Sequence, residues 1–411
     1  MRLFAKYGDP AGRGLLPFSY GEMLTRLDWL YEPMLLGISG SLFVLMIALL
    51  VTSVAHAAPP IPTTGLIFSD DFSAFDRATP TNPKGRWQTT FSPFASQNLA
   101  LGNRELQNEQ EVYVEPEFGG VACNLNPHTG APMVIYGRSG KVVDVDPVTK
   151  QPYPCYTQLA TPPLGINPFQ PLPGGGLALT ADYAPKGVGN LLWGKPYTSA
   201  LLTTRTTFSF LYGCAEIVFQ SQGGKGLWPA FWLLRADGVG PAELDVTEED
   251  GANAFTVYES LHSNAIAGVP LPAGTTATGN AHSYPAVVGF DLTQGYHART
   301  ACWSDREIVW YVDNVEMHRE ATPADLHSPM YLLGNLAVGG AWFGYPDNAT
   351  PFPAQMRILS VKVWSIPTGP IPPASLPVGA FPAAQPWPPV SKFFDLTLPD
   401  ATRWTGNLTK R

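Results

Sequence analysis

The stretch EIVWYVDNVEMHR, residues 307–319, decides the fold class of this chain. Asp313 and Asn314 separate two runs that are rich in β-branched and aromatic residues, a pattern that predicts a β-hairpin. Short runs of this kind, bounded by turn residues, recur along the chain, whereas no long segment has a helical period. Four further examples are LALTADY (177–183), FSFLYGCAEIVFQ (208–220), FTVYESLHS (255–263) and MRILSVKVW (356–364). We therefore predict an all-β domain over residues 67–366, an antiparallel β-sandwich of the jelly-roll type.

The composition supports this prediction and limits the class of partner. Glycine (40 residues) and proline (42 residues) are each near a tenth of the 411 residues, and only 14% of the residues are charged. This mixture favours short strands and turns over long amphipathic helices. The formal net charge is −8 and no basic run occurs, which argues against nucleic acid or an anionic membrane surface as a partner. A neutral or weakly charged substrate fits better.

An apolar segment near the N-terminus predicts export. Residues 33–69 contain no Asp, Glu, Lys or Arg, and the core LFVLMIALLV (42–51) is followed by a small-x-small site that ends at Ala57. Residues 35–57 therefore read as a signal peptide, or residues 35–58 remain as an uncleaved membrane anchor. The status of residues 1–34 is open, and Met23 or Met34 is an alternative start. In either case we expect a secreted, periplasmic or cell-surface protein.

Other segments outside the strand-rich region are rich in proline, and the cysteines suit an exported protein. Residues 58–66 read as a linker and residues 367–411 as an extended tail that is draped over the domain or disordered.

Cys123 and Cys155 flank a polar segment that a disulfide could staple. Cys214 and Cys302 lie in strand-like stretches and fit equally well as small buried hydrophobic residues. No CxxC or Cys/His cluster occurs, so we expect neither a metal ion nor a cofactor.

The stretch ELDVTEED, residues 243–250, crowds five carboxylates into eight positions. On a regular strand, Glu243, Asp245 and Glu249 would share one face and Glu248 would point away. One extra residue in the strand, a β-bulge, would instead bring Glu248 to the side of Glu243. The remaining interpretations are a solvated acidic turn and a calcium loop.

Spacing favours the bulged arrangement, with the bulge at residues 246–247. With it, Glu243 and Glu248 are effectively four strand steps apart, roughly 13 Å between Cα atoms. Two glutamates that lean toward each other across this span leave about 5 Å between their carboxyl groups, the separation found in retaining glycosidases. Without the bulge, Glu243 and Glu249 are roughly 20 Å apart, too far to flank one glycosidic bond. The spacing therefore selects Glu248 and leaves Glu249, with Asp250, as a solvated strand end.

Two neighbouring motifs identify a family. GLWPAFWLL (226–234) followed by ELDVTE (243–248) resembles glycoside hydrolase family 16, the laminarinase-like group, whose signature is E-x-D-x-x-E on a bulged strand after a W-P-A-F-W segment. Further stretches match in the same order between about residues 67 and 364, among them NRELQNEQEVYV (103–114) and NLAVGGAWFG (335–344). The resemblance implies a concanavalin-like jelly roll with a concave substrate cleft, and a polysaccharide as the substrate.

The resemblance also implies roles for individual residues. Glu243 corresponds to the nucleophile, Asp245 to an assisting carboxylate and Glu248 to the general acid/base. Residues that match substrate-binding positions are Trp228, Trp232, His262, Trp342, Asn103 and Glu105. The family commonly binds a structural calcium through an aspartate on its last strand, but Leu359 and Ser360 stand there in this chain. We therefore predict no metal site.

Together these observations predict a secreted, monomeric, endo-acting glycoside hydrolase without a cofactor. Its expected reaction is retaining cleavage of internal β-1,3 or β-1,3/1,4 bonds in a β-glucan or a bacterial exopolysaccharide. One alternative is a transglycosylase of the same fold, which passes the glycosyl group to a sugar instead of water. Another is a non-catalytic glucan-binding protein, which the retention of all three carboxylates disfavours.

Overall fold

The structure, a computed structural model, describes residues 65–79, 81–89, 109–119, 121–122, 157–158, 163–188, 192, 195–238, 242–266, 276–278, 281–371 and 387. Residues 1–64, most of the tail, and Asn103, Glu105, Cys123 and Cys155 lie outside the described residues, so the expectations placed on them stay predictions. Within the described ranges, no helix is long and apolar enough to cross a membrane.

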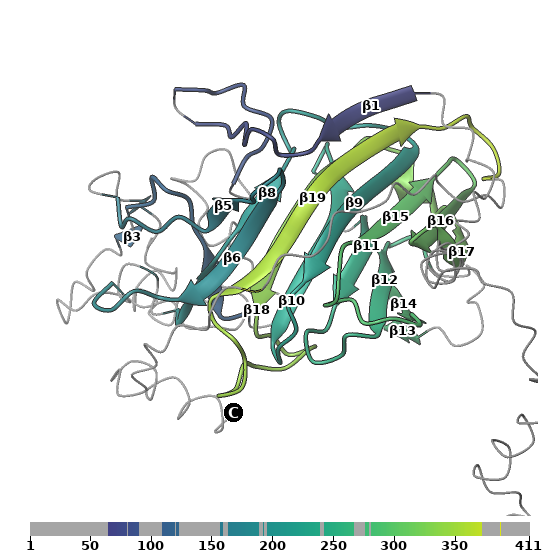
Figure 1. The fold of residues 1–411 in the computed structure, drawn as a ribbon. Helices are drawn as coiled ribbons and strands as arrows, with labels where there is room; N and C mark the ends of the chain where they lie inside the picture. Colours follow the sequence, from purple (N-terminus) through teal and green to yellow (C-terminus); the bar gives the residue numbers. More distant parts are fainter. Residues whose placement is uncertain are drawn as a thin grey trace, which may run out of the picture. The chain divides into compact units, whose positions relative to one another are not determined.

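Two large, mostly antiparallel sheets lie one over the other (Figure 1). The ten-stranded sheet contains β1 (Gly65–Asp70), β2 (Glu111–Tyr113), β5 (Phe169–Pro171), β6 (Leu177–Tyr183), β7 (Tyr197–Ser199), β9 (Gly213–Ser221), β15 (His297–Trp303), β16 (Glu307–Val312), β17 (Val315–Ala321) and β19 (Ala354–Ser365). The seven-stranded sheet contains β8 (Leu201–Thr203), β10 (Leu227–Arg235), β11 (Glu243–Glu249), β12 (Thr256–His262), β13 (Thr276–Thr278), β14 (Ala281–Val287) and β18 (Met330–Val338). Two small elements complete the description, the pair β3 (Val121–Ala122) and β4 (Thr157–Gln158), and the 3-10 helix η2 (Ala324–Leu326). The predicted all-β sandwich is confirmed.

The order of the strands places β11 at the centre of the seven-stranded sheet. Its order is β13-β14-β12-β11-β10-β18-β8, and that of the ten-stranded sheet is β17-β16-β15-β9-β19-β6-β7-β2, with β1 paired to β19 and β5 to β6. Strands adjacent in the sheet are often distant in the sequence, as for β10 and β18. The acidic stretch therefore lies on a strand that has neighbours on both sides.

The hairpin predicted from residues 307–319 is formed by β16 and β17. Val312 pairs with Val315, and the two residues between them have left-handed backbones, with φ of 47° at Asp313 and 66° at Asn314. Two successive positive φ values define a type I′ turn, whose twist matches that of the strands it joins, and Asx residues adopt them readily. The local sequence therefore favours a tight turn at this position.

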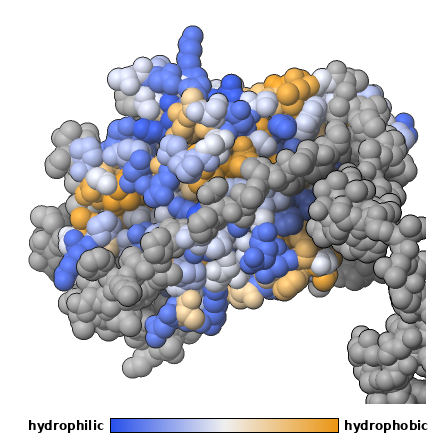
Figure 2. Space-filling model, viewed as in Figure 1, coloured by the Kyte–Doolittle hydropathy of each residue, from blue (hydrophilic) through white to orange (hydrophobic). Residues whose placement is uncertain are grey.

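The hydrophobic core lies between the two sheets. Phe219 and Trp310 from the ten-stranded sheet belong to the same buried cluster as Phe231 and Leu244 from the seven-stranded sheet. Full burial of a large apolar side chain contributes roughly 1.5–3 kcal/mol to folding, so this layer stabilises the sandwich. Figure 2 shows that hydrophobic and hydrophilic residues are interspersed on one outer face of the protein.

A disulfide joins Cys214 on β9 to Cys302 on β15, which decides the question that the sequence left open. These residues are directly opposite each other in the antiparallel ladder, with 3.9 Å between their Cα atoms, although 88 residues separate them in the sequence. The ladder register, not the local sequence, brings them together. Ile371 packs beside the disulfide and its carbonyl accepts a hydrogen bond from Arg319 (2.9 Å), so the start of the tail contacts the ten-stranded sheet.

Candidate active site

Strand β11 contains the predicted β-bulge. Along its pairing with β12, Asp245 lies opposite Ser260 and Glu248 opposite Tyr258, so β11 takes three residue steps where β12 takes two. Along its pairing with β10, Val246 has no partner. The extra residue changes the alternation of side chains, so that Glu248 lies on the same face as Asp245. The bulge at residues 246–247 is therefore confirmed.

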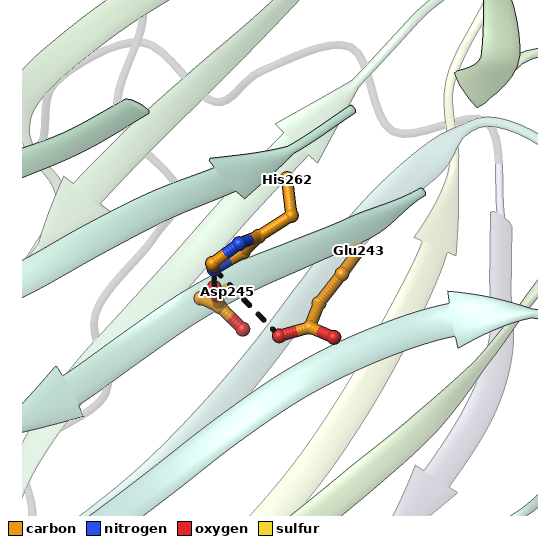
Figure 3. A group of neighbouring side chains, drawn as sticks. All are labelled: Glu243, Asp245 and His262. Atoms are coloured by element: carbon orange, nitrogen blue, oxygen red, sulfur yellow. Dashed lines mark ion pairs between the residues drawn. The ribbon is translucent and has the colours of Figure 1, made fainter. Parts of the chain in front are cut away.

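The side chains of Glu243, Asp245 and His262 lie close together in space (Figure 3). They are on the outer face of the seven-stranded sheet, because the alternating residue Leu244 belongs to the core cluster. Glu243 and His262 are cross-strand partners on β11 and β12. The Nε2 atom of His262 lies 3.2 Å from an Asp245 carboxyl oxygen and 3.7 Å from a Glu243 carboxyl oxygen. The imidazole thus bridges two carboxyl groups and can orient both of them. The sequence pattern predicted that Glu243 and Asp245 share a face, and the family resemblance assigned His262 to substrate binding; the structure brings the three side chains together.

Glu248 is buried beside this group and receives two hydrogen bonds. The indole Nε1 of Trp228 donates to one carboxyl oxygen (3.1 Å) and the hydroxyl of Ser260 donates to the other (3.2 Å). Burial, reinforced by the negative charge of Asp245, raises the pKa of Glu248 well above its usual value, although the Ser260 bond acts in the opposite direction. The raised pKa favours the protonated form of Glu248, which suits the role of a general acid.

Asp245 lies between Glu243 and Glu248 and has only 2% of its surface exposed. Burial raises the pKa of Asp245 to about 8, because a low-dielectric environment disfavours the charged carboxylate. When Asp245 is protonated, its carboxyl group can donate a hydrogen bond to a neighbouring carboxylate. When Asp245 is ionised, its negative charge disfavours the loss of the proton from Glu248.

This burial predicts a pH-dependent stability gain in Asp245→Asn. The folded protein holds the Asp245 proton up to a pKa of about 8, whereas the unfolded chain releases it near 3.8. The unfolded state therefore binds fewer protons over this window, and the wild type loses stability as pH rises from about 4 to 8. Melting temperatures measured across this range should show a growing advantage for Asp245→Asn, which levels off above pH 8. Asp250→Asn is the control, and a pH-independent difference between Asp245→Asn and the wild type would contradict the expectation.

An aromatic cluster covers the Glu248 side of the site. The rings of Trp228, Tyr258, Trp342 and Phe343 pack on one another with centroids 4.3–5.6 Å apart. Trp342 is 39% exposed, whereas Trp228 is only 8% exposed. Trp228, which the family resemblance assigns to substrate binding, therefore has little surface open to a ligand, because the cluster covers it and its indole N–H donates to Glu248. The exposed indole is that of Trp342, which can stack on the apolar face of a sugar ring.

A chain of hydrogen bonds extends from Trp232 on the other side of the site. Trp232 is half-buried and lies opposite Asp245 on β10. Its indole donates to Asn335 (2.8 Å), whose amide donates in turn to the Tyr113 hydroxyl (2.9 Å). Next to Tyr113 on β2, a carboxyl oxygen of Glu111 accepts from the Val338 N–H (2.8 Å), and burial raises the pKa of Glu111 to about 7. This polar chain fixes the Trp232 ring.

Sequence reasoning missed several of these residues. Asn335, Tyr113 and Ser260 were not assigned to the site, although each of them lies in a stretch that matches the family. Strand register is the signal for Ser260, because it faces Asp245 directly. For Asn335 and Tyr113 no local signal exists, since 222 residues separate them.

Glu249 points in the opposite direction from Glu248, into the space between the sheets. Its carboxylate accepts hydrogen bonds from the Arg299 Nε atom (2.8 Å) and from Ser221, and lies 2.5 Å from a second Arg299 nitrogen. Both Glu249 and Arg299 are almost completely buried. The prediction of a solvated strand end is wrong for Glu249, because the bulge turns it toward a cation on the opposite sheet. Asp250 is partly exposed and accepts a turn hydrogen bond from the N–H of Ala252 (2.9 Å).

Comparison with known proteins finds a matching family and related sequences. Residues 174–356 match the family described as glycosyl hydrolases family 16. The endo-1,3-1,4-beta-glycanase ExsH of Rhizobium meliloti is 38% identical over 205 residues, which are 50% of this chain and 41% of that protein. The chain thus spans about two fifths of the length of this curated relative.

Solved structures are similar as well. An endo-beta-1,3-glucanase from Pyrococcus furiosus is 30% identical, with 48% of this chain and 78% of that chain covered and a TM-score of 0.40. A crystal structure of a mutant of SCLam, a non-specific endo-beta-1,3(4)-glucanase, is 18% identical, with 75% of this chain and 98% of that chain covered and a TM-score of 0.50. The second likeness concerns the fold.

Proposed function

The chain belongs to glycoside hydrolase family 16, and we propose that it hydrolyses internal β-1,3 or β-1,3/1,4 bonds of a β-glucan or bacterial exopolysaccharide with retention of configuration. One observation carries the proposal. The bulge in β11 places Glu243, Asp245 and Glu248 on one outer face, and Glu248 alone of the two adjacent glutamates joins this face.

The arrangement supports a double displacement. The Glu243 carboxylate attacks the anomeric carbon while Glu248 gives its proton to the glycosidic oxygen, so the bond to the leaving sugar breaks and a glycosyl ester forms. The Glu248 carboxylate then takes a proton from water, whose oxygen attacks the anomeric carbon and releases Glu243. Asp245 and His262 orient the Glu243 carboxylate. The Nε2 atom of His262 lies 3.7 Å from a Glu243 carboxyl oxygen and 3.2 Å from an Asp245 carboxyl oxygen. The raised pKa of Glu248 suits its first role as an acid.

The sugar-binding surface supports a polysaccharide substrate. Trp342 offers an exposed indole beside Glu248, and Trp232 is fixed beside Asp245. Each of these indoles can stack on the apolar face of a sugar ring. The name of the relative ExsH, an endo-1,3-1,4-beta-glycanase, supports a substrate that contains both linkages for this chain as well.

Export is part of the proposal. The apolar segment of residues 35–57 predicts a signal peptide, and the Cys214–Cys302 disulfide suits an oxidising compartment. We therefore place the enzyme outside the cytoplasm, with a polysaccharide as its partner.

A panel of purified polysaccharides tests the function. Laminarin, lichenan, curdlan, agar and bacterial exopolysaccharides are incubated with the enzyme, and the anomer of the first product is followed by NMR. We expect shortened chains from a β-1,3- or mixed-linkage glucan and a product of β configuration. An α product would overturn the retaining mechanism. Longer chains formed at high sugar concentration would favour a transglycosylase, and binding without cleavage would favour a glucan-binding protein.

A further inference from the structure

A side chain from the opposite sheet reaches the backbone of the catalytic strand. The indole Nε1 of Trp310, on β16 of the ten-stranded sheet, donates a hydrogen bond of 2.8 Å to the carbonyl oxygen of Asp245, on β11 of the seven-stranded sheet. Neither the sequence motif nor the proposed mechanism accounts for this contact. The two residues are 65 positions apart in the sequence.

The bulge explains why this carbonyl can be reached. In a regular ladder, each backbone carbonyl lies along the plane of its sheet and pairs with an adjacent strand. A donor that comes from the opposite sheet needs a carbonyl turned out of that plane. A β-bulge disrupts the ladder locally and leaves one residue unpaired, and Val246 immediately follows Asp245. An acceptor turned into the core without a partner would destabilise the fold, so the bulge requires a donor at this carbonyl.

Trp310 is a rigid donor. Its side chain is completely buried in the core between the sheets. Its ring packs against that of Tyr284 with 5.7 Å between centroids, and its backbone pairs with Ala301 on one side and His318 on the other. The indole N–H is thus held in one position by both the sheet and the core. Its hydrogen bond fixes the direction of the peptide group that enters the bulge.

We infer that Trp310 is a positioning residue of the active site, which holds the bulge of β11 in the register that places Asp245 and Glu248 on one face. The hydrogen bond holds the peptide group that follows Asp245. The orientation of that peptide group determines the face on which the side chains of residues 246–248 lie. The expected effect of Trp310 on catalysis rests on the proposed function. The expected effect of Trp310 on the backbone of β11 is independent of that function.

The test compares Trp310→Phe with Trp303→Phe. Trp303 is a matched control, because it is buried in the same core cluster and its indole also donates to a backbone carbonyl, but that carbonyl belongs to Leu326 (3.1 Å) and not to β11. Both variants lose an indole N–H and a similar volume. A purely structural role predicts similar behaviour for the two.

Three measurements distinguish the variants, each made well below the melting temperature of the variant. Amide hydrogen exchange of residues 245–248 should accelerate at least about tenfold in Trp310→Phe and stay unchanged in Trp303→Phe. The kcat should fall about 10–100-fold in Trp310→Phe with KM within about twofold, because a small displacement of a catalytic group is costly. The alkaline limb of the pH profile should move to lower pH, because Glu248 then lies farther from the charge of Asp245.

The outcomes separate this inference from the proposed function. Equal exchange rates at residues 245–248 in both variants, or equal losses of kcat, would overturn the role of Trp310. A wild type that cleaves no polysaccharide would overturn the proposed function, and the exchange measurement would still decide whether Trp310 holds the bulge. If Trp310→Phe does not fold, the same measurements on Trp310→Tyr decide, because the tyrosine hydroxyl fills slightly more of the vacated volume and tyrosine has no N–H at the indole position.

Discussion

Glu243→Gln is expected to lower kcat by at least about 10⁴-fold, the size of loss that follows removal of a catalytic nucleophile. An amide has no negative charge with which to attack the anomeric carbon, so the glycosyl ester does not form. Substrate affinity should change little, because Trp342 and Trp232 remain in place. Initial rates on the preferred polysaccharide, with the protein verified as folded by circular dichroism, give the measurement.

Two companion variants sharpen this result. Asp250→Asn removes a carboxylate from the same stretch but outside the site and should retain wild-type kcat. Glu248→Gln should lose most activity on polysaccharide and much less on an aryl glycoside with an acidic phenol as leaving group, since such a group departs without a proton. A Glu243→Gln enzyme within about tenfold of wild-type activity would sink the assignment of the nucleophile.

Glu249→Gln is expected to destabilise the fold by about 3–5 kcal/mol, although it changes the residue next to the catalytic acid. The neutral amide leaves the Arg299 guanidinium buried without its counter-charge. For a domain of this size the loss corresponds to a melting temperature lower by roughly 10 °C. Activity measured where the variant is folded should stay within about tenfold of wild type, because Glu249 faces the core. Thermal unfolding of both proteins provides the measurement.

A double variant is the control for this second prediction. Glu249→Leu combined with Arg299→Met replaces the ion pair by apolar side chains of similar size and should recover most of the lost stability, because no unpaired charge is left in the core. Equal melting temperatures for Glu249→Gln and the wild type would show that the buried ion pair contributes nothing.

Most of the site could be predicted where local periodicity governs the geometry. The alternation along residues 243–250, together with the spacing that a glycosidic bond requires, led to a bulge at residues 246–247 and to Glu248. The hairpin at Asp313 and Asn314 was equally local, because both residues adopt left-handed backbones readily. Signals of this kind are carried by a few adjacent residues, so a single sequence displays them.

The predictions that were wrong or open concern partners distant in the sequence. Burial of Trp228 follows from the packing of Trp342 and Phe343, which are more than 100 positions away. The cation opposite Glu249 is 50 positions away, and no pattern near either residue announces the pair. Local sequence gives the face on which a side chain lies but not what covers that face.

By itself, the sequence determined the all-β class, the bulged acidic strand and the choice of Glu248, because β periodicity and turn chemistry depend on neighbouring residues. Only the tertiary structure decided that Cys214 bonds to Cys302, that Glu249 pairs with Arg299 and that Trp310 holds the Asp245 carbonyl. Each of these contacts joins two strands that are not consecutive in the sequence. Such a contact forms only when the sheets are assembled and packed.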